Sequence, residues 1–96
     1  MISILLATYN WPQALKLCLE SLATQTDRDF EIIIADDGST ESTKQVIEAF
    51  KGSSSIAITH LWQEDKGFRK TKILNQAIAV AKGSYLIFLD GDCIVQ

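Results

Sequence analysis

Three short polar clusters each follow an apolar stretch of the sequence. They are the segments 9–10 (Tyr-Asn), 36–39 (Asp-Asp-Gly-Ser) and 90–92 (Asp-Gly-Asp). The last two contain four carboxylates, which repel one another at close range unless a positive charge lies among them. A divalent cation meets that requirement, and carboxylate oxygens are ligands that suit magnesium and manganese. If the fold brings these clusters together, we expect them to hold Mg²⁺ or Mn²⁺.

A fourth polar segment is basic. Residues 67–72 (Gly-Phe-Arg-Lys-Thr-Lys) supply three cations where a helix is expected to begin, and a helix N-terminus favours anions. The chain has no G-x-x-x-x-G-K-[ST] loop and no G-x-G-x-x-G after its first apolar stretch, so it lacks the common backbone cradles for phosphate. A bound diphosphate would therefore depend on a metal ion and on basic side chains.

Each cluster taken alone has a plainer interpretation. Asp37-Gly38 is a common turn dipeptide that can also cap a helix, and the segment 90–92 can be a turn into another strand. Gly67 can be an ordinary loop glycine, and Arg69, Lys70 and Lys72 can form a solvated face. The functional interpretation depends on all of the clusters meeting in space.

The order of elements predicts that they do meet. Apolar segments rich in β-branched residues alternate with segments of helical periodicity. We expect strands at 2–7, 30–35, 56–62 and 85–89, and helices beginning at Pro12, after a Ser39 or Thr40 cap, and at 70–82 before a Gly83 cap. This βαβαβαβ order predicts an α/β, Rossmann-like parallel sheet with helices on both faces. Such sheets bind ligands beyond the carboxyl ends of their strands, where all three acidic and polar clusters would lie.

The spacing of apolar residues predicts which helical faces are buried. We expect the first strand to be covered on both faces, because its apolar run is continuous. The expected inward-facing helical residues are Leu15, Cys18, Leu19 and Leu22, then Val46, Ile47 and Phe50, then Ile73, Ala77, Ile78 and Ala81.

Composition excludes several classes of function. The chain has 96 residues, 47% of them hydrophobic and 22% charged, as in a small globular domain. A net charge of −3 argues against a nucleic-acid binder. No apolar run in these residues approaches the length of a membrane span, so we expect neither a transmembrane segment nor a signal peptide among them. Cys18 and Cys93 fit no metal or disulfide spacing, and a single histidine, His60, argues against a Ser-His-Asp triad or a multi-histidine zinc site.

The ordered motifs resemble those of the family 2 glycosyltransferases, which have the GT-A fold. The resemblance covers essentially the whole chain and is closest to a subgroup that includes chondroitin-type polymerases and bacterial surface-glycan transferases. Two positions depart from the usual pattern: Ala7 replaces a proline, and Leu74 stands where many members have arginine before Asn75. The segments that carry the resemblance are 7–10, 25–26, 29–31, 36–39, 65–69, Asn75 and 89–93.

The resemblance implies an inverting transfer of a sugar from a UDP-sugar to an acceptor hydroxyl, in surface-polysaccharide or glycoconjugate synthesis. The metal, Mn²⁺ or Mg²⁺, would offset charge on the departing UDP. The implied metal ligands are Asp92 and Asp90, and no residue matches the family's general base. The implied nucleotide-binding residues are Ala7, Thr8, Tyr9, Asp36, Asp37, Gly67, Arg69, Lys72, Asn75 and Asp90.

The abrupt apolar ending at 93–96 suggests that residues 1–96 are a truncated GT-A nucleotide-sugar-binding domain that ends just after the D-x-D motif. We expect a chain that binds the nucleotide and metal but lacks the acceptor site and is inactive alone. Its expected partners are the UDP-sugar and, in the whole protein, a saccharide or glycolipid acceptor. We also expect self-association through uncovered sheet edges, and a cytoplasmic location that extends to the membrane face in the full-length protein.

Two other classes of protein remain as alternatives. A receiver-type regulatory module also places carboxylates at strand ends, but its acidic pair should follow the first strand, whereas here it follows the second. Labelling by acetyl phosphate would distinguish it. A sugar nucleotidyltransferase would need a glycine-rich basic loop after the first strand, and the segment 10–13 (Asn-Trp-Pro-Gln) is not one.

Overall fold

The computed structural model describes residues 2–8, 12–24, 29–36, 38–53, 55–63 and 70–90, with the backbone alone for Lys70, Thr71 and Asp90. The elements alternate as the sequence predicts. They are β1 (Ile2–Thr8), α1 (Pro12–Ala23), β2 (Phe30–Asp36), α2 (Glu41–Ser53), β3 (Ala57–Trp62), α3 (Lys70–Val80) and β4 (Tyr85–Asp90).

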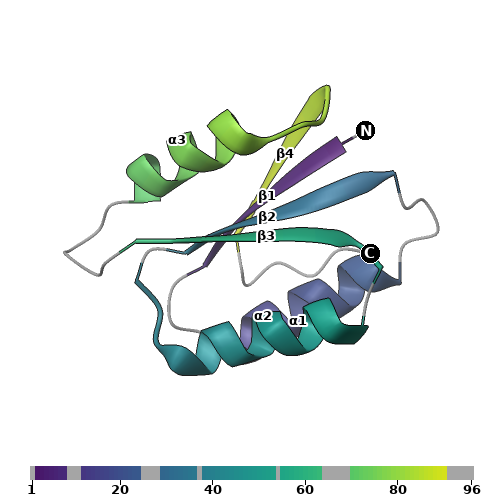
Figure 1. Cartoon of the computed structure of the whole chain (residues 1–96), viewed down its shortest axis with the longest axis vertical. Helices are drawn as coiled ribbons and strands as arrows, with labels where there is room; N and C mark the ends of the chain where they lie inside the picture. Colours follow the sequence, from purple (N-terminus) through teal and green to yellow (C-terminus); the bar gives the residue numbers. More distant parts are fainter. Residues whose placement is uncertain are drawn as a thin grey trace.

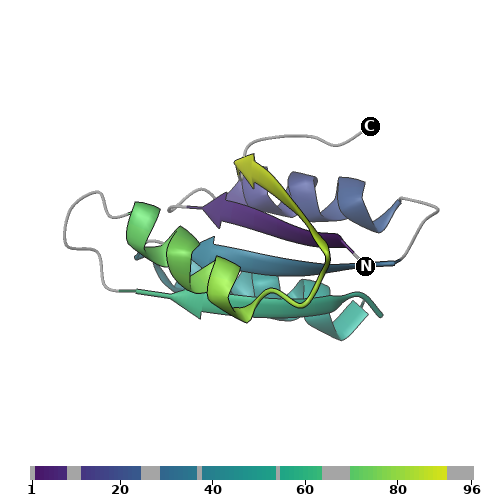
Figure 2. The same cartoon turned by 90° about the horizontal axis from the view of Figure 1, so that it is seen from above.

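The four strands form one parallel sheet in the order β3-β2-β1-β4. Helices α1 and α2 cover one face and α3 covers the other (Figure 1; Figure 2). Strands β2 and β3 are added on one side of β1 and β4 is added on the other, so the strand order reverses beside β1. The predicted fold class is therefore confirmed, and the point where α/β sheets bind ligands lies at the carboxyl ends of β1 and its neighbours.

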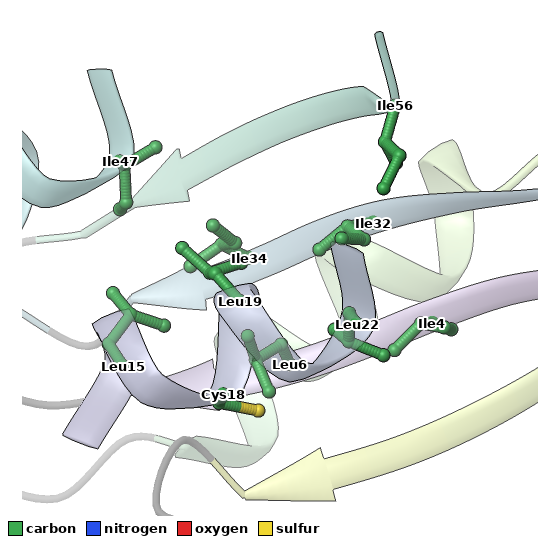
Figure 3. Packing of buried hydrophobic residues seen from close by; sticks show 10 residues of the cluster. All are labelled: Ile4, Leu6, Leu15, Cys18, Leu19, Leu22, Ile32, Ile34, Ile47 and Ile56. Atoms are coloured by element: carbon green, nitrogen blue, oxygen red, sulfur yellow. The ribbon is translucent and has the colours of Figure 1, made fainter. Parts of the chain in front are cut away.

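Strands β1 and β2 are buried on both faces, as their continuous apolar runs predict. Ile4, Leu6, Ile32 and Ile34 pack with α1 on one face (Figure 3). The intervening residues, Leu5, Ile33 and Ala35, pack with Ile73 and Ala77 of α3 on the opposite face. Alternation along each strand thus supplies two cores, one on each side of the sheet.

Helix α1 begins at Pro12, whose fixed φ and missing N–H suit the first helical turn. Its predicted apolar stripe is confirmed, because Leu15, Cys18, Leu19 and Leu22 are all buried. Helix α2 begins at Glu41, directly after Thr40, as the predicted cap requires.

In helix α2 the predicted buried face is only partly right. Ile47 is buried, but Val46 and Phe50 are only partly buried against the core. Thr43, which the apolar pattern could not indicate, is fully buried. Thr43 lies one turn before Ile47, so the line of contact with the sheet passes through these two residues.

In helix α3 the prediction is wrong for Ile78, which is 42% exposed. The buried stripe follows the i, i+4 line through Ile73 and Ala77, with partly buried Ala81 beyond. Ile78 lies about 100° around the helix from Ala77 and therefore points away from the sheet.

The predicted end of α3 is also wrong. The helix stops at Val80, three residues before Gly83, so Gly83 does not cap it directly. Instead, the Gly83 amide donates to Ser3 Oγ of β1 at 2.8 Å. The predicted start of the third strand is one residue too early: Ile56 is buried, but β3 begins at Ala57.

Glu31 connects the exit of α3 to the sheet. Its Oε2 accepts hydrogen bonds from the Ser3 hydroxyl at 2.7 Å and from the Lys82 amide at 2.6 Å. Burial raises the pKa of Glu31, but the bonds from Lys82 and Ser3 and the Lys82 charge together hold this pKa below its ordinary value. The network lies at the amino ends of β1 and β2, so it anchors α3 at the edge opposite the predicted site.

Within the described ranges, no helix has the length and apolar character needed to cross a membrane.

Candidate functional site at the carboxyl edge of the sheet

The strand register brings predicted site residues together at one edge. Thr8 pairs with Asp36 of β2, and Ala7 pairs with Asp90 of β4. Ala7 and Thr8 are each only 8% exposed, so the end of β1 is buried between the two strands that end in aspartates. The expectation that the polar clusters share one edge is confirmed for the backbones of Asp36 and Asp90.

Asp36 is buried, with 1% of its side chain exposed, and both of its carboxylate oxygens have partners. Oδ1 accepts the Ser39 amide at 2.9 Å, a contact that links the end of β2 to the residue two positions before α2. Gly38 in the loop after β2 has a φ of 93°, a left-handed conformation that glycine adopts without steric cost. Oδ2 lies 2.9 Å from Nε2 of His60. The structure therefore places Asp36 as an internal support of the loop after β2.

The last residue of β3 and the residue that follows it support the same loop at two further points. The Trp62 indole N–H donates to the Ser39 carbonyl at 3.1 Å, and the Gln63 amide donates to the Asp36 carbonyl at 3.1 Å. The Trp62 ring is exposed and borders a cavity of about 360 Å³ that Lys44 and His60 also line. The loop is thus held from the β3 side.

Helix α3 presents two of the predicted residues, Lys72 and Asn75, with exposed side chains. Because α3 follows β3 in the chain, its first turn lies toward the carboxyl edge of the sheet (Figure 1). Lys72 is in that first turn and Asn75 is in the next. Their position is compatible with contacts to an anion at the edge, where the helix dipole also favours negative charge.

The remaining predictions lie outside the described residues. They are the roles of Tyr9, Asp37, Gly67, Arg69 and Asp92, together with the side chain of Asp90. In the part of the chain that the structure describes, no three His, Cys, Asp or Glu side chains form a cluster suited to a metal ion. Cys18 is a buried free thiol, as expected, and Cys93 lies outside the described residues.

His60 is the residue that sequence reasoning missed. The sequence led only to the conclusion that one histidine is too few for a catalytic triad. The sequence held only part of the signal, because alternation along β3 places His60 and Trp62 on one face but does not give the register of β3 against β2. Trp62 pairs with Asp36 in the parallel register, which sets His60 diagonally across from that carboxylate.

Comparison with known proteins begins with a family model described as "Glycosyl transferase family 2", which matches residues 3–96. The glycosyltransferase GlyG of Streptococcus pneumoniae is 36% identical over 100% of this chain and 31% of its own length. The chondroitin synthase of Escherichia coli is 35% identical over 95% of this chain and 13% of its own length. The chain therefore spans about a third or less of these relatives.

Two solved structures have the same arrangement of elements. The mannosyltransferase PcManGT from Pyrobaculum calidifontis, in complex with GDP-Man and Mn²⁺, superposes with a TM-score of 0.84 at 24% identity, over 95% of this chain and 27% of its own. TarS 1–349 from S. aureus, in complex with UDP-GlcNAc, superposes with a TM-score of 0.77 at 30% identity, over 95% of this chain and 26% of its own.

Proposed function

Because the chain belongs to glycosyl transferase family 2, we propose that it forms the donor-binding part of a glycosyltransferase that uses a UDP-sugar. The whole protein would transfer the sugar to an acceptor hydroxyl with inversion, in the synthesis of a surface polysaccharide or glycoconjugate. The acceptor would be a saccharide or a glycolipid. No residue of this chain is assigned as the general base.

One observation carries the proposal: the register that places the ends of β2 and β4 on either side of the end of β1. Asp36 and Asp90, which are more than fifty residues apart in the sequence, thereby end strands on either side of β1, where the strand order reverses. In parallel α/β sheets this is where ligands bind. The choice of uridine is supported by TarS, which is 30% identical to this chain and was solved with UDP-GlcNAc.

A divalent cation fits the chemistry of the D-x-D motif, which begins at Asp90, the last residue of β4. Asp90 and Asp92 offer carboxylate oxygens, which suit Mn²⁺ or Mg²⁺. Bound there, the ion would stabilise negative charge on the departing UDP as a Lewis acid. PcManGT, which shares the fold, was solved with Mn²⁺ and the nucleotide sugar GDP-Man.

Side chains of the protein would make the remaining contacts to the UDP-sugar. Ala7, Thr8 and Tyr9 would pack against the uracil and ribose, and Asp37 would bond to the base. The first turns of α3 would face the diphosphate, since a helix N-terminus and Lys72 both favour negative charge. Gly67, Arg69 and Asn75 would complete the contacts to base and diphosphate, with Asp36 holding the loop that carries Asp37.

The test is a calorimetric titration of UDP into the chain with and without Mn²⁺, repeated with Asp92→Ala. We expect binding that requires Mn²⁺ and is lost in the variant. Asp29→Ala is the matched control, because this exposed carboxylate precedes β2 at the opposite edge of the sheet. Binding that ignores Mn²⁺ would remove the metal role of Asp92, and absence of binding under all conditions would contradict the proposal.

A further inference from the structure

The loop after β2 depends on one buried carboxylate with two different partners. Asp36 Oδ1 binds the Ser39 amide within the loop, and Oδ2 binds the His60 imidazole from the neighbouring strand. Because a carboxylate oxygen accepts, Nε2 must carry the proton in this pair. The His60 imidazole therefore connects the Asp36 carboxylate, which also binds the loop, to strand β3.

This link lies in a protected environment. The His60 side chain is 12% exposed and that of Asp36 is 1% exposed, so water has little access to the bond. Removing the imidazole would leave a buried carboxylate oxygen without this partner, which is costly and favours rotation of the carboxyl group away from the sheet. Such a rotation would also displace Oδ1 and weaken its bond to the Ser39 amide.

We propose that His60 is a positioning residue for the nucleotide site, holding Asp36 so that the loop carrying Asp37 has the right shape to read the uracil base. This inference rests on the proposed function above. Trp62 and Gln63 also support the loop, but they bond to backbone carbonyls. His60 differs from them because it bonds to the carboxylate whose other oxygen accepts the Ser39 amide.

A purely structural role for His60 makes a different prediction. In that case, losing the imidazole would lower the stability of the fold but leave the affinity and base preference of the folded protein unchanged. A positioning role requires both to change, because the loop would contact uracil in a poorer geometry. Discrimination between UDP and CDP is therefore the property that separates the two explanations.

The test compares UDP and CDP binding, in the presence of Mn²⁺, for the unchanged chain, His60→Gln and His60→Leu. We expect His60→Leu to bind UDP about tenfold more weakly, the usual order for losing a hydrogen bond to a charged group. Its preference for UDP over CDP should shrink as well. His60→Gln can still donate from its amide nitrogen and should retain both affinity and preference. Thr59→Ala, an exposed neighbour on the other face of β3, is the control and should bind normally.

A second comparison tests the route through Asp36. If His60 acts only by holding that carboxylate, then His60→Leu should add no further loss of affinity in an Asp36→Asn background. If His60→Leu proves too unstable to titrate, His60→Asn, whose amide is too short to reach the same point, replaces it with the same expected result.

The outcomes are distinguishable. If the unchanged chain does not bind UDP, the proposed function fails and this inference fails with it. If the unchanged chain binds UDP and prefers it to CDP, but His60→Leu shows the same affinity and preference, the positioning role alone is overturned.

Discussion

At the scale of single residues, the bond network around Glu31 makes a prediction about pH. The pKa of this carboxyl is lower in the folded chain than in the unfolded chain. The stability that Glu31 contributes is therefore fully present above its unfolded pKa, about 4.3, and is lost as the pH falls through the lower folded value. Glu31→Gln should cost about 1–2 kcal/mol near neutral pH, because an uncharged oxygen accepts the Ser3 and Lys82 bonds less strongly.

Urea unfolding at pH 7 and in the acid range below pH 4 checks this prediction. The unchanged chain should lose more stability on acidification than Glu31→Gln does, so the two should converge at low pH. Glu48→Gln, an exposed carboxyl on α2, is a suitable control and should follow the unchanged chain. Parallel pH profiles for the unchanged chain and Glu31→Gln would contradict the assignment.

Two glycines test the backbone strain at the β2–α2 loop. Gly38 has a φ of 93°, whereas Gly52 lies in helix α2 with open space where an alanine methyl group would sit. Gly38→Ala should destabilise the fold by about 1–2 kcal/mol, because an L-residue pays that cost in the left-handed region. Gly52→Ala should instead be neutral or stabilise by up to about 1 kcal/mol, since alanine is the better helix former. Equal effects at both positions, measured by thermal unfolding, would show that the loop conformation is not the cause.

At the scale of residues, the sequence predicts where the acidic strand ends lie but not which side chains bond to them. Asp36 and Asp90 could be placed at a common edge from the alternation of elements alone, without knowing where any strand begins. The contact between Asp36 and His60 could not, because it depends on the register of β3 against β2. A shift of one residue would send His60 to the other face. The roles of Tyr9, Asp37, Arg69 and Asp92 stay predictions.

At the scale of elements, predictability followed the strength of the apolar pattern. Strands β1 and β2 and helix α1 were placed almost to the residue, since each has a continuous apolar run or a full stripe. Helix α3 was extended too far because Ala81 and Lys82 are good helix formers, although the chain turns at Lys82 toward Glu31. Its stripe was made too wide because Ile78 is apolar. That turn is a tertiary contact between residues far apart in sequence, which local periodicity does not contain.

Helix α1 offers a matched pair of leucines on opposite faces. Leu19 is fully buried in the core beneath the helix, whereas Leu17 is 53% exposed (Figure 3 shows Leu19 among its neighbours). Leu19→Ala should cost about 3 kcal/mol through lost burial and the cavity that remains. Leu17→Ala should change the free energy of unfolding by less than about 0.5 kcal/mol, as is usual at the surface. Chemical unfolding of both variants measures the difference, and similar losses would contradict the placement of α1 on the sheet.

At the scale of the whole molecule, the sheet is covered unevenly. Its centre, β1 and β2, is buried on both faces, but β4 pairs with β1 alone among the described residues. Four consecutive side chains of β4 are exposed, alternating between the two faces of the sheet. They are Tyr85 at 73%, Leu86 at 38%, Ile87 at 42% and Phe88 at 54%. An apolar strand with a free edge can pair with another strand. Edge strands usually carry charged residues or prolines that prevent such pairing, and residues 85–88 contain neither.

We predict that the chain self-associates through β4, so that its mass in light scattering rises with concentration. Phe88→Lys should lower that association, because a charge on an edge strand opposes pairing while leaving the buried core of β1 and β2 intact. Leu17→Lys is the matched control, since Leu17 on α1 is as exposed as Phe88 but lies on a helix without a free backbone edge. Both variants place one lysine at a similarly exposed apolar position, so a general effect of added charge would reduce association equally. A selective effect of Phe88→Lys locates the contact on β4, whereas a constant monomer mass for the unchanged chain up to millimolar concentration would show that the exposed strand does not pair.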